Sequence, residues 1–491
     1  MRTQLKRLTT DTAIYGISTI IGRFLNFLLV PLYTNLFSRA EYGIVSTVFS
    51  YLAFSNVILG LGMEAAFMRY YSTLDAGTKK ETFSAPFFSI AVFSLFVSLV
   101  IFLQAPSLYS FLQIDHRWSM LIPLAAGTLA IDALCVLPFA LLRMENKAWY
   151  FVRIKTLAIV VTVALNIWFL GVQKLSIEYI FVAGIIGSAI SLVCLLPVIF
   201  KNLSFKLPHG ILNKMLMLGL PTLPAGLAGI ILQVVDRPLM LYLTNAETVG
   251  LYQANYKLGI FMMLIISMFQ YAWQPFYLQT AKESNARAIF SRVLTYFVLF
   301  TSAIFLCLTL FLEPIVKFSI FQYHLLGKEY WAGLFIVPII LLSYIFTGIG
   351  IICSAGLLIE KKTKTMPIVM GLSAGLNIIA NFILIPPLGI LGGALATLIS
   401  YVAMALLYWR FNQSVYPIAF EYRRLFKISL ALVVALLPVL LQWNPIPTSE
   451  MLWRILLLVS FPLLLVVLRF FEPNESVTLR QWLRIFSFQT K

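Results

Sequence analysis

Fourteen long apolar runs, separated by short polar connections, limit what this sequence can fold into. An α-helix needs about 20 apolar residues to cross the hydrocarbon core of a bilayer, whereas a strand of a membrane barrel needs only about 10. The runs have the helical length, and the connections are too short to hold folded domains. The sequence therefore predicts an all-α integral membrane protein with 14 transmembrane helices. The predicted spans are residues 12–36, 43–68, 84–104, 118–142, 150–170, 178–200, 214–243, 249–278, 290–312, 331–357, 366–385, 389–409, 425–442 and 452–470.

Composition and local motifs support this class and exclude others. Hydrophobic residues make up 60% of the chain and charged residues only 11%, which is too few charges to cover the surface of a water-soluble protein. No small-residue cleavage site follows the first run, so we interpret it as an uncleaved span and not as a signal peptide. The four cysteines lie far apart inside apolar runs, which indicates neither disulfides nor a metal site.

The positions of lysine and arginine predict the orientation. Of the 36 basic residues, 27 fall in alternate connections that include both termini, six fall in the other connections, and three lie within spans. Because basic residues accumulate on the cytoplasmic side, both termini are predicted to be cytoplasmic. The net charge of +17 follows from this topology and does not indicate nucleic-acid binding. Residues 473–491 are too polar to span, and the helical spacing of their apolar side chains predicts an amphipathic helix on the inner leaflet, with a frayed tail as the alternative.

A weak internal repeat divides the chain into two halves. Similar strings end in Gly43 and Gly250, an offset of 207. Three further polar residues recur at an offset of 215, namely Glu145, Lys147 and Asn166 as Glu360, Lys362 and Asn381. Six spans per copy make the copies parallel, as in transporters whose substrate site lies between the halves. The predicted units are an N-lobe (residues 1–205, spans 1–6), a C-lobe (206–411, spans 7–12), spans 13 and 14 (412–472) and the cytoplasmic tail (473–491).

Three prolines interrupt predicted spans. Pro221 and Pro224 lie near the cytoplasmic end of the seventh span, and Pro31 lies in the first. Proline removes a backbone hydrogen bond and kinks a helix, so we expect bends at both places. Each bend is either a static kink or a hinge that lets one half rock against the other.

Three basic residues, Arg23, Arg237 and Lys257, lie inside predicted spans. Arg23 is roughly 16 Å along the first helix, which places it close to the midplane of the bilayer. A charge at that depth costs a few kcal/mol or more and usually faces a bundle interior or a water-filled cavity. Arg23 is therefore either paired with a carboxylate for structural reasons or lines a substrate cavity.

Several strings along the whole chain resemble polysaccharide flippases of the O-antigen (Wzx) type. These flippases belong to the multidrug/oligosaccharidyl-lipid/polysaccharide (MOP) exporter superfamily. The strings are Gly22-Arg23-Phe24-Leu25-Asn26, Pro31-Leu32-Tyr33-Thr34, Glu41-Tyr42-Gly43, residues 60–70, Asp236-Arg237, Val249-Gly250-Leu251-Tyr252 and residues 377–394.

The resemblance implies two six-helix lobes around a central cavity, two added C-terminal helices, and alternating access in a bacterial inner membrane. It implies that the substrate is an oligosaccharide on undecaprenyl pyrophosphate, turned from the inner to the outer leaflet. Membrane lipids and the polysaccharide polymerase machinery are the further partners it implies. The related peptidoglycan-precursor flippases carry an Arg-Asp pair late in the first span, where this chain has Asn26. The related drug exporters favour an acidic cavity, and a cation-coupled multidrug exporter of this fold is the alternative function.

A binding site for pyrophosphate is expected to contain guanidinium and ammonium groups, because charge-assisted bonds to phosphate are strong. The predicted substrate-binding residues are Arg23, Arg237 and Lys257, as a ladder of cations, with Arg69 at the inner mouth. The acids within spans, which either neutralise cations or couple transport to H⁺ or Na⁺, are Glu64, Asp132 and Asp236. The chain has no GxxxxGK[ST] nucleotide loop, and neither a cofactor nor a metal site is predicted.

A membrane enzyme acting on lipid-linked glycans is the competing class. Such an enzyme needs a reactive site on the outer face, usually on a sizeable loop. The longest outer connection, residues 313–330, holds one histidine, and the three histidines (His116, His209 and His324) form no metal or triad pattern. The sequence therefore predicts a transporter and not an enzyme.

Overall fold

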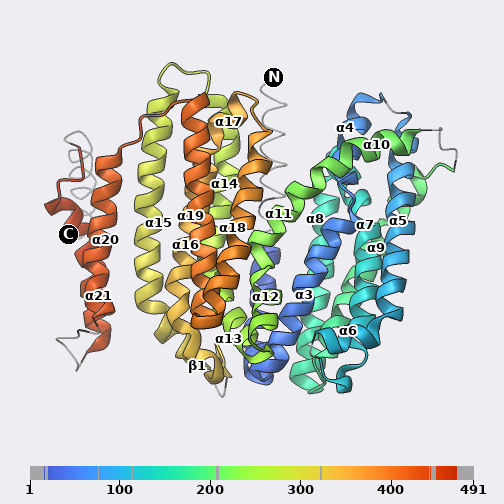
Figure 1. Ribbon diagram of the computed structural model, residues 1–491, viewed down its shortest axis with the longest axis horizontal. Helices are drawn as coiled ribbons and strands as arrows, with labels where there is room; N and C mark the ends of the chain where they lie inside the picture. The colour runs from blue at the N-terminus through green and yellow to red at the C-terminus, as the bar shows by residue number, and fades with distance from the viewer. Residues whose placement is uncertain are drawn as a thin grey trace, which may run out of the picture.

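Long helices make up nearly all of the described structure (Figure 1). The computed structural model describes residue 16 and residues 20–75, 77–112, 114–205, 210–320, 323–441, 443 and 449–472. Within these ranges the β structure is a single antiparallel hairpin of β1 (Ser319–Ile320) and β2 (Tyr323–His324). The predicted amphipathic tail lies outside the described residues.

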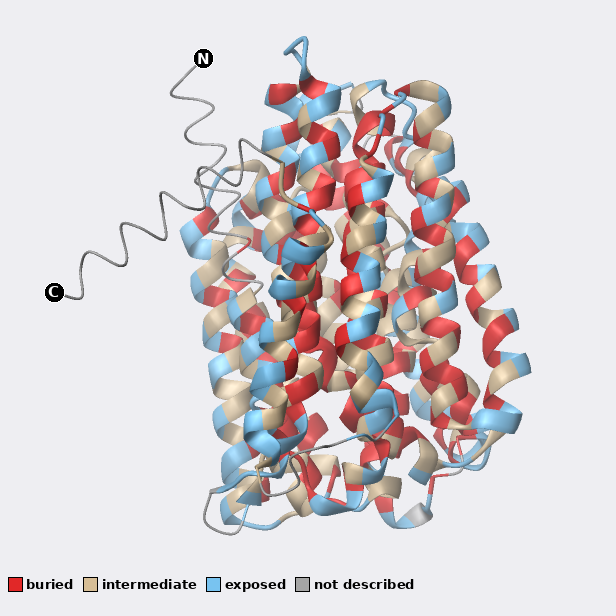
Figure 2. Cartoon of the chain, turned by 90° about the vertical axis from the view of Figure 1, so that its left-hand side faces the viewer, coloured by how far each residue is buried: buried red, intermediate tan, exposed pale blue. Residues whose placement is uncertain are grey.

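Within the described residues all fourteen predicted spans fall on helices, which confirms the predicted fold class. Twelve helices among the described residues are long and apolar enough to cross a membrane. The other two spans correspond to the shorter helix Ile20–Leu36 and to α20 (Tyr422–Leu440). Large apolar side chains on outward faces are exposed, such as Val92, Phe96 and Leu99 on α5 (Lys79–Leu103). Figure 2 shows the same pattern, with buried residues concentrated between the helices, as expected of a multi-pass membrane protein.

The helices follow one another as two halves and a C-terminal pair. The first half contains Ile20–Leu36 with its last part α2 (Leu29–Leu36), α3 (Arg39–Leu59), α4 (Met63–Thr73), α5, α6 (Ala105–Phe111), η1 (His116–Trp118), α7 (Leu121–Met144), α8 (Ala148–Asn166), the π-helical η2 (Ile167–Val172) and α9 (Glu178–Asn202). The second half contains α10 (Ile211–Gly219), η3 (Leu220–Thr222), α11 (Leu223–Val234), α12 (Asp236–Leu243), α13 (Ala246–Tyr256), η4 (Lys257–Gly259), α14 (Ile260–Thr280), α15 (Ala286–Lys317), η5 (Lys328–Ile336), α16 (Val337–Cys353), α17 (Ala355–Ile359), α18 (Thr365–Leu388) and α19 (Ile390–Val415). The C-terminal pair, α20 and α21 (Glu450–Val467), packs against α15 through an apolar core that the three helices share.

The predicted interruptions occur at or beside the prolines. In the seventh span α10 ends at Gly219, a 3-10 turn containing Pro221 follows, and α11 begins at Leu223. The first helix has a turn at Leu28, three residues before Pro31, where the ring nitrogen cannot donate a helical hydrogen bond. Whether these bends move during function stays a prediction.

Each half has an apolar core, and each core includes residues from one helix of the other half. The core of the first half includes Ile211 and Met215 of α10, which packs against α4 and α5. The core of the second half includes Phe27 and Val30 of the first helix. After the turn at Pro221, α11 packs against α18 of the second half. The interruption therefore allows one span to contact both lobes.

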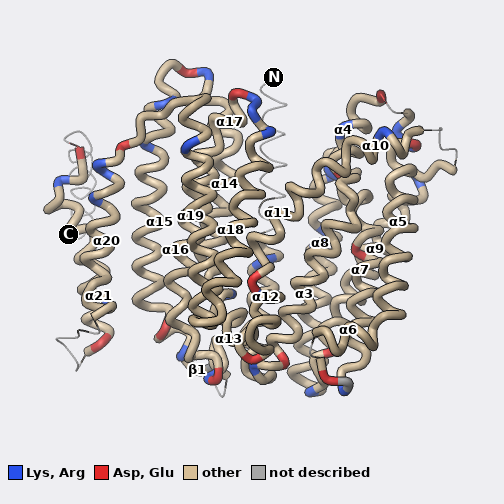
Figure 3. Tube along the Cα trace, in the orientation of Figure 1, with Lys and Arg blue, Asp and Glu red and all other residues tan. Residues whose placement is uncertain are grey.

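The lobes touch at one end of the molecule, which we call the closed end (lowest in Figure 1). There Tyr330 donates a hydrogen bond to the carbonyl of Phe37 at 3.0 Å. Asn35 forms two bonds with the backbone of His324, at 2.7 and 3.1 Å. The opposite end, which carries the α17–α18 connection, we call the open end. Connections predicted to be cytoplasmic lie there, and Figure 3 shows basic residues among them.

Candidate functional site

A cavity of about 770 Å³ is lined mainly by helices of the second half, with the first helix and α3 of the first half along one side. It extends from Gln253 and Lys257, on the closed-end side, to Leu358 of α17 and Met366 of α18 at the open end. The three basic residues that were predicted to lie within spans all line it. Among the described residues that line it there is no aspartate or glutamate. The described wall of the cavity therefore contains basic and no acidic residues, and whether it binds an anionic substrate stays a prediction.

Arg23 reaches across the cavity from the first helix. Its Nη1 donates a hydrogen bond to the Oγ atom of Ser267 on α14, at 2.8 Å. Within the described part of the chain no carboxylate pairs with Arg23, and its side chain is exposed to the cavity. Of the two alternatives for this residue, the described structure thus agrees with a cavity-lining arginine and shows no structural ion pair.

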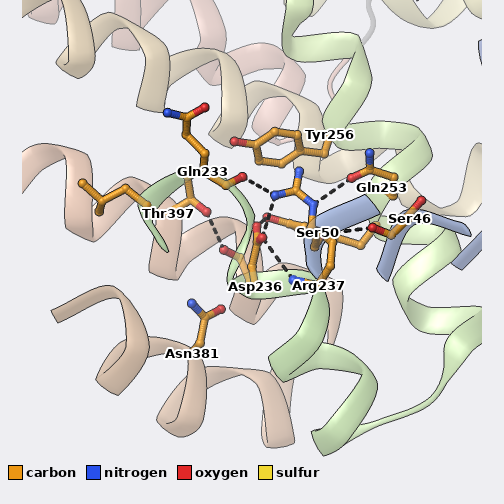
Figure 4. Close-up of polar contacts among 12 residues, drawn as sticks. Ser46, Ser50, Gln233, Asp236, Arg237, Gln253, Tyr256, Asn381 and Thr397 are labelled. Atoms are coloured by element: carbon orange, nitrogen blue, oxygen red, sulfur yellow. Dashed lines mark hydrogen bonds and ion pairs between the residues drawn. The ribbon is translucent and has the colours of Figure 1, made fainter. Parts of the chain in front are cut away.

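Arg237, by contrast, is held in a buried network at the start of α12 (Figure 4). The helix breaks at Val235 because Pro238 lacks the N–H that would continue the ladder. Asp236 pairs with Arg237 at 2.7 Å and also accepts the backbone N–H of Arg237 at 3.1 Å. Both side chains are only about 5% exposed.

Two further hydrogen bonds and an aromatic ring hold the guanidinium of Arg237. Its Nε donates to Gln253 at 2.8 Å, its Nη1 donates to the carbonyl of Gln233, and its guanidinium lies 4.2 Å from the ring centre of Tyr256. Tyr252 completes the network by donating to Asp236. Of the three predicted cations, Arg237 is thus paired with Asp236, and its role in a ladder for the substrate stays a prediction.

Lys257 is the second free cation. It lies in the short 3-10 segment η4 that interrupts the helix between α13 and α14. In the described structure its ammonium group forms neither an ion pair nor a hydrogen bond, and it lines the cavity. Ten residues separate Lys257 from Ser267, the partner of Arg23, which is about 15 Å of helix. Arg23 and Lys257 thus place two positive charges at different depths.

Two of the three predicted acids lie away from these cations. Glu64 pairs with Arg143 of α7, and both side chains are about 40% exposed. Asp132 of α7 accepts a hydrogen bond from Ser188 of α9 at 2.6 Å and interacts electrostatically with Lys155 of α8. Only the third acid, at the start of α12, neutralises one of the predicted substrate-binding cations.

Arg69 does not belong to the cavity wall in this conformation. It is exposed on α4, near the open end, and is not one of the described residues that line the cavity. A role at the inner mouth stays a prediction.

Sequence reasoning missed a set of neutral polar residues in the cavity wall. They share a position inside apolar spans and are Asn26, Gln233, Gln253, Gln270 and Gln274. An amide in a membrane span is costly unless it is paired or faces water, so its position in the sequence was a usable signal. Tyr256 and Trp273, which would otherwise be assigned to interfacial belts, also line the cavity.

Comparison with known proteins identifies the fold. The family model described as "Polysaccharide biosynthesis protein" matches residues 8–281, which is more than half of the chain. None of the curated protein sequences compared with the chain matches it.

Solved structures give the same fold at low sequence identity. The inward closed conformation of the lipid II flippase MurJ is similar over 96% of this chain and 100% of that one, with a TM-score of 0.75 and 19% identity. An inward-facing multidrug resistance MATE family transporter of the MOP superfamily covers 80% and 94%, with a TM-score of 0.61 and 15% identity. A mutant of the Vibrio cholerae MATE transporter VcmN covers 84% and 96%, with a TM-score of 0.58 and 15% identity. These similarities confirm the predicted fold.

Proposed function

The chain belongs to the polysaccharide biosynthesis protein family, and from this we propose that it is a flippase for lipid-linked oligosaccharide. It would turn an oligosaccharide carried on undecaprenyl pyrophosphate from the inner to the outer leaflet of the bacterial inner membrane. The polysaccharide polymerase machinery would then use the exported unit.

One observation carries the proposal: a cavity between the lobes has two unpaired cations and no carboxylate among the described residues of its wall. Unpaired guanidinium and ammonium groups in a membrane protein are costly, so a substrate that supplies negative charge would relieve that cost. A pyrophosphate offers several acceptor oxygens for the donors of Arg23 and Lys257. The buried pair of Arg237 and Asp236, whose charges cancel, holds this part of the wall in place.

The proposed path follows the separation of the cations. The pyrophosphate enters from the open end and binds Arg23 first. It then moves about 15 Å along α14 and η4 to Lys257, near the closed end. Release on the other side requires the lobes to separate at the closed end, which is alternating access. The polyprenyl chain would stay in the bilayer throughout.

The three acids within spans, which are the candidates for coupling to H⁺ or Na⁺, differ in how their charges are balanced. Asp236 and Glu64 each form an ion pair, with Arg237 and Arg143, and their charges are thereby balanced. Asp132 is held by Ser188 without an ion pair among the described residues. Of the three acids, Asp132 is therefore the one we propose as the coupling site, if transport is driven by an ion.

Export of surface glycan in cells that lack their own flippase tests the proposal. The chain should restore export in a strain whose glycan it accepts. Arg23→Ala should abolish most of that export, and Arg23→Lys should retain part of it, because a charge remains but the fork of donors is lost. Equal membrane levels of all three proteins are the control.

Two results would count against the flippase. Full export by Arg23→Ala would remove the cationic site from the mechanism. Protection from cationic drugs, with no export in any matched strain, would instead support the multidrug exporter alternative on the same fold.

A further inference from the structure

One face of α14 carries two amides and two aromatic side chains into the cavity. Gln270, Trp273, Gln274 and Tyr277 all line it, and their spacing of three, four and seven residues places them on one side of the helix. Since α14 lies in an apolar span, an amide there needs a hydrogen-bond partner. In the described part of the chain neither Gln270 nor Gln274 has one, and both are exposed to the cavity. Their donors and acceptors are free to bind water or a substrate.

The aromatic part of this face contains an unsatisfied donor. Trp273 is only 3% exposed, and its Nε1 has no hydrogen-bond partner in the described structure. Its ring is held by Phe269, stacked at 5.7 Å, and by Phe290, edge-on at 5.4 Å. Buried donors are nearly always paired in folded proteins, so an unpaired one beside a cavity indicates a position that a ligand completes. The ring packing also makes this part of the wall rigid.

We propose that this face of α14 is the glycan-binding wall of the cavity; the inference rests on the proposed flippase function and adds the site of the sugars. A sugar ring has a rim of hydroxyls, which suits the free amides of Gln270 and Gln274. Trp273 and Tyr277, each 3% exposed, pack beside these amides and fix the wall. No carboxylate lines the described cavity, so the wall suits neutral or acidic sugars and not glycans with free amino groups.

The position of the wall orders the substrate in the cavity. Ser267, which holds Arg23, lies one turn from Gln270 and two turns from Gln274 on the same helix. Seven residues of α14 span about 10 Å, enough for the first sugars of a glycan. With the pyrophosphate at Arg23, the sugars therefore extend along α14 toward the open end.

Binding of two lipids to the purified full-length protein in nanodiscs separates the two proposals. One probe is undecaprenyl pyrophosphate without sugar. The other is the same lipid carrying the oligosaccharide of a strain whose export the chain restores. We compare the wild type with Gln270→Leu/Gln274→Leu, with Arg23→Ala, and with Gln279→Leu, an exposed amide on α14 that does not line the cavity.

Loss of two hydrogen bonds of about 1 kcal/mol each predicts about 10- to 30-fold weaker binding of the sugar-bearing lipid by the double variant. Binding of the sugar-free lipid should not change, and Gln279→Leu should bind both lipids normally. Arg23→Ala should weaken both. Thermal unfolding of each variant checks that it is folded, and Gln270→Asn/Gln274→Asn, which keeps the amides, should recover part of the affinity if the double leucine variant unfolds.

The outcomes that overturn each idea differ. If the double variant binds both lipids normally, or loses both equally, the glycan wall is wrong while the flippase proposal stands. If Arg23→Ala binds both lipids normally, the anion site and the proposed function fail.

Discussion

At the closed end α3 and α13 touch through their backbones. Toward the open end, by contrast, a cavity with unpaired charges lies between helices of the second half and the first helix and α3 of the first half. A Cβ atom on Gly43 would lie 1.9 Å from the carbonyl oxygen of Ala246, and one on Gly250 would lie 1.9 Å from that of Arg39. Both pairs of positions are related by the same offset of 207, so the contact is symmetric between the two halves of the repeat. Small residues allow helix backbones to approach in membranes. Two glycines therefore allow the close contact at the closed end, whereas the cavity is characterised by the charged side chains of Arg23 and Lys257.

The largest effect is expected from adding side chains at the two glycines where α3 and α13 touch. Gly43→Val and Gly250→Val each place atoms against a backbone carbonyl, which no side-chain rotation can relieve. Overpacking costs about 1–3 kcal/mol, and a rigid backbone contact lies at the upper end, so we expect the population of the closed state to fall about 100-fold. Export should be lost.

The state of the closed end can be measured with a thiol. In a chain whose four native cysteines are replaced by alanine, Thr34→Cys, buried against Gly327 of the second half at the closed end, should react with a membrane-impermeant reagent only when this end opens. Gly43→Val should raise that rate. Gly375→Val is the matched control, because a Cβ on Gly375 meets nothing within 4 Å. Normal export and an unchanged rate in Gly43→Val would show that the contact is dispensable.

The second prediction compares the free cation Lys257 with the paired Arg237. Lys257→Met removes a charge that no described carboxylate balances, so it should weaken binding of undecaprenyl pyrophosphate about 10- to 100-fold, the range for a lost bond to a charged group. Asp236→Asn/Arg237→Gln removes a pair whose charges cancel, and binding should change by less than about threefold. Thermal unfolding verifies that both variants are folded. Equal losses in the two variants would mean that Arg237 contacts the substrate after all.

The features that depend on hydropathy and covalent geometry could be predicted from the sequence. All fourteen spans were predictable because apolar length alone determines whether a helix crosses a bilayer. The interruption at Pro221 was predictable because proline removes a hydrogen bond wherever it occurs in a helix. The three cations inside spans were found because a charge in an apolar run is costly wherever the helices pack.

The partners of these groups could not be predicted, because they depend on how the helices pack. Asp236 is next to Arg237 in sequence and does pair with it, yet Glu64 pairs with Arg143, 79 residues away. The repeat pointed to Gly43, but neither the spacing nor the composition shows that it meets the opposite lobe. The glutamines of α14 were overlooked because neutral amides give a weaker signal than charges.

The smallest effect is expected for Tyr330→Phe, which tests whether hydrogen bonds contribute to closure at this end. Tyr330→Phe removes one hydrogen bond to the carbonyl of Phe37, worth about 1 kcal/mol, so the reaction rate of Thr34→Cys should rise about fivefold. Tyr323→Phe, whose side chain is exposed at the same end, should leave the rate unchanged. If Tyr330→Phe has no effect while Gly43→Val opens the closed end, closure depends on the fit of the two backbones. If Tyr330→Phe opens it as far as Gly43→Val does, the hydrogen bonds hold the lobes together, and the glycines only permit them to form.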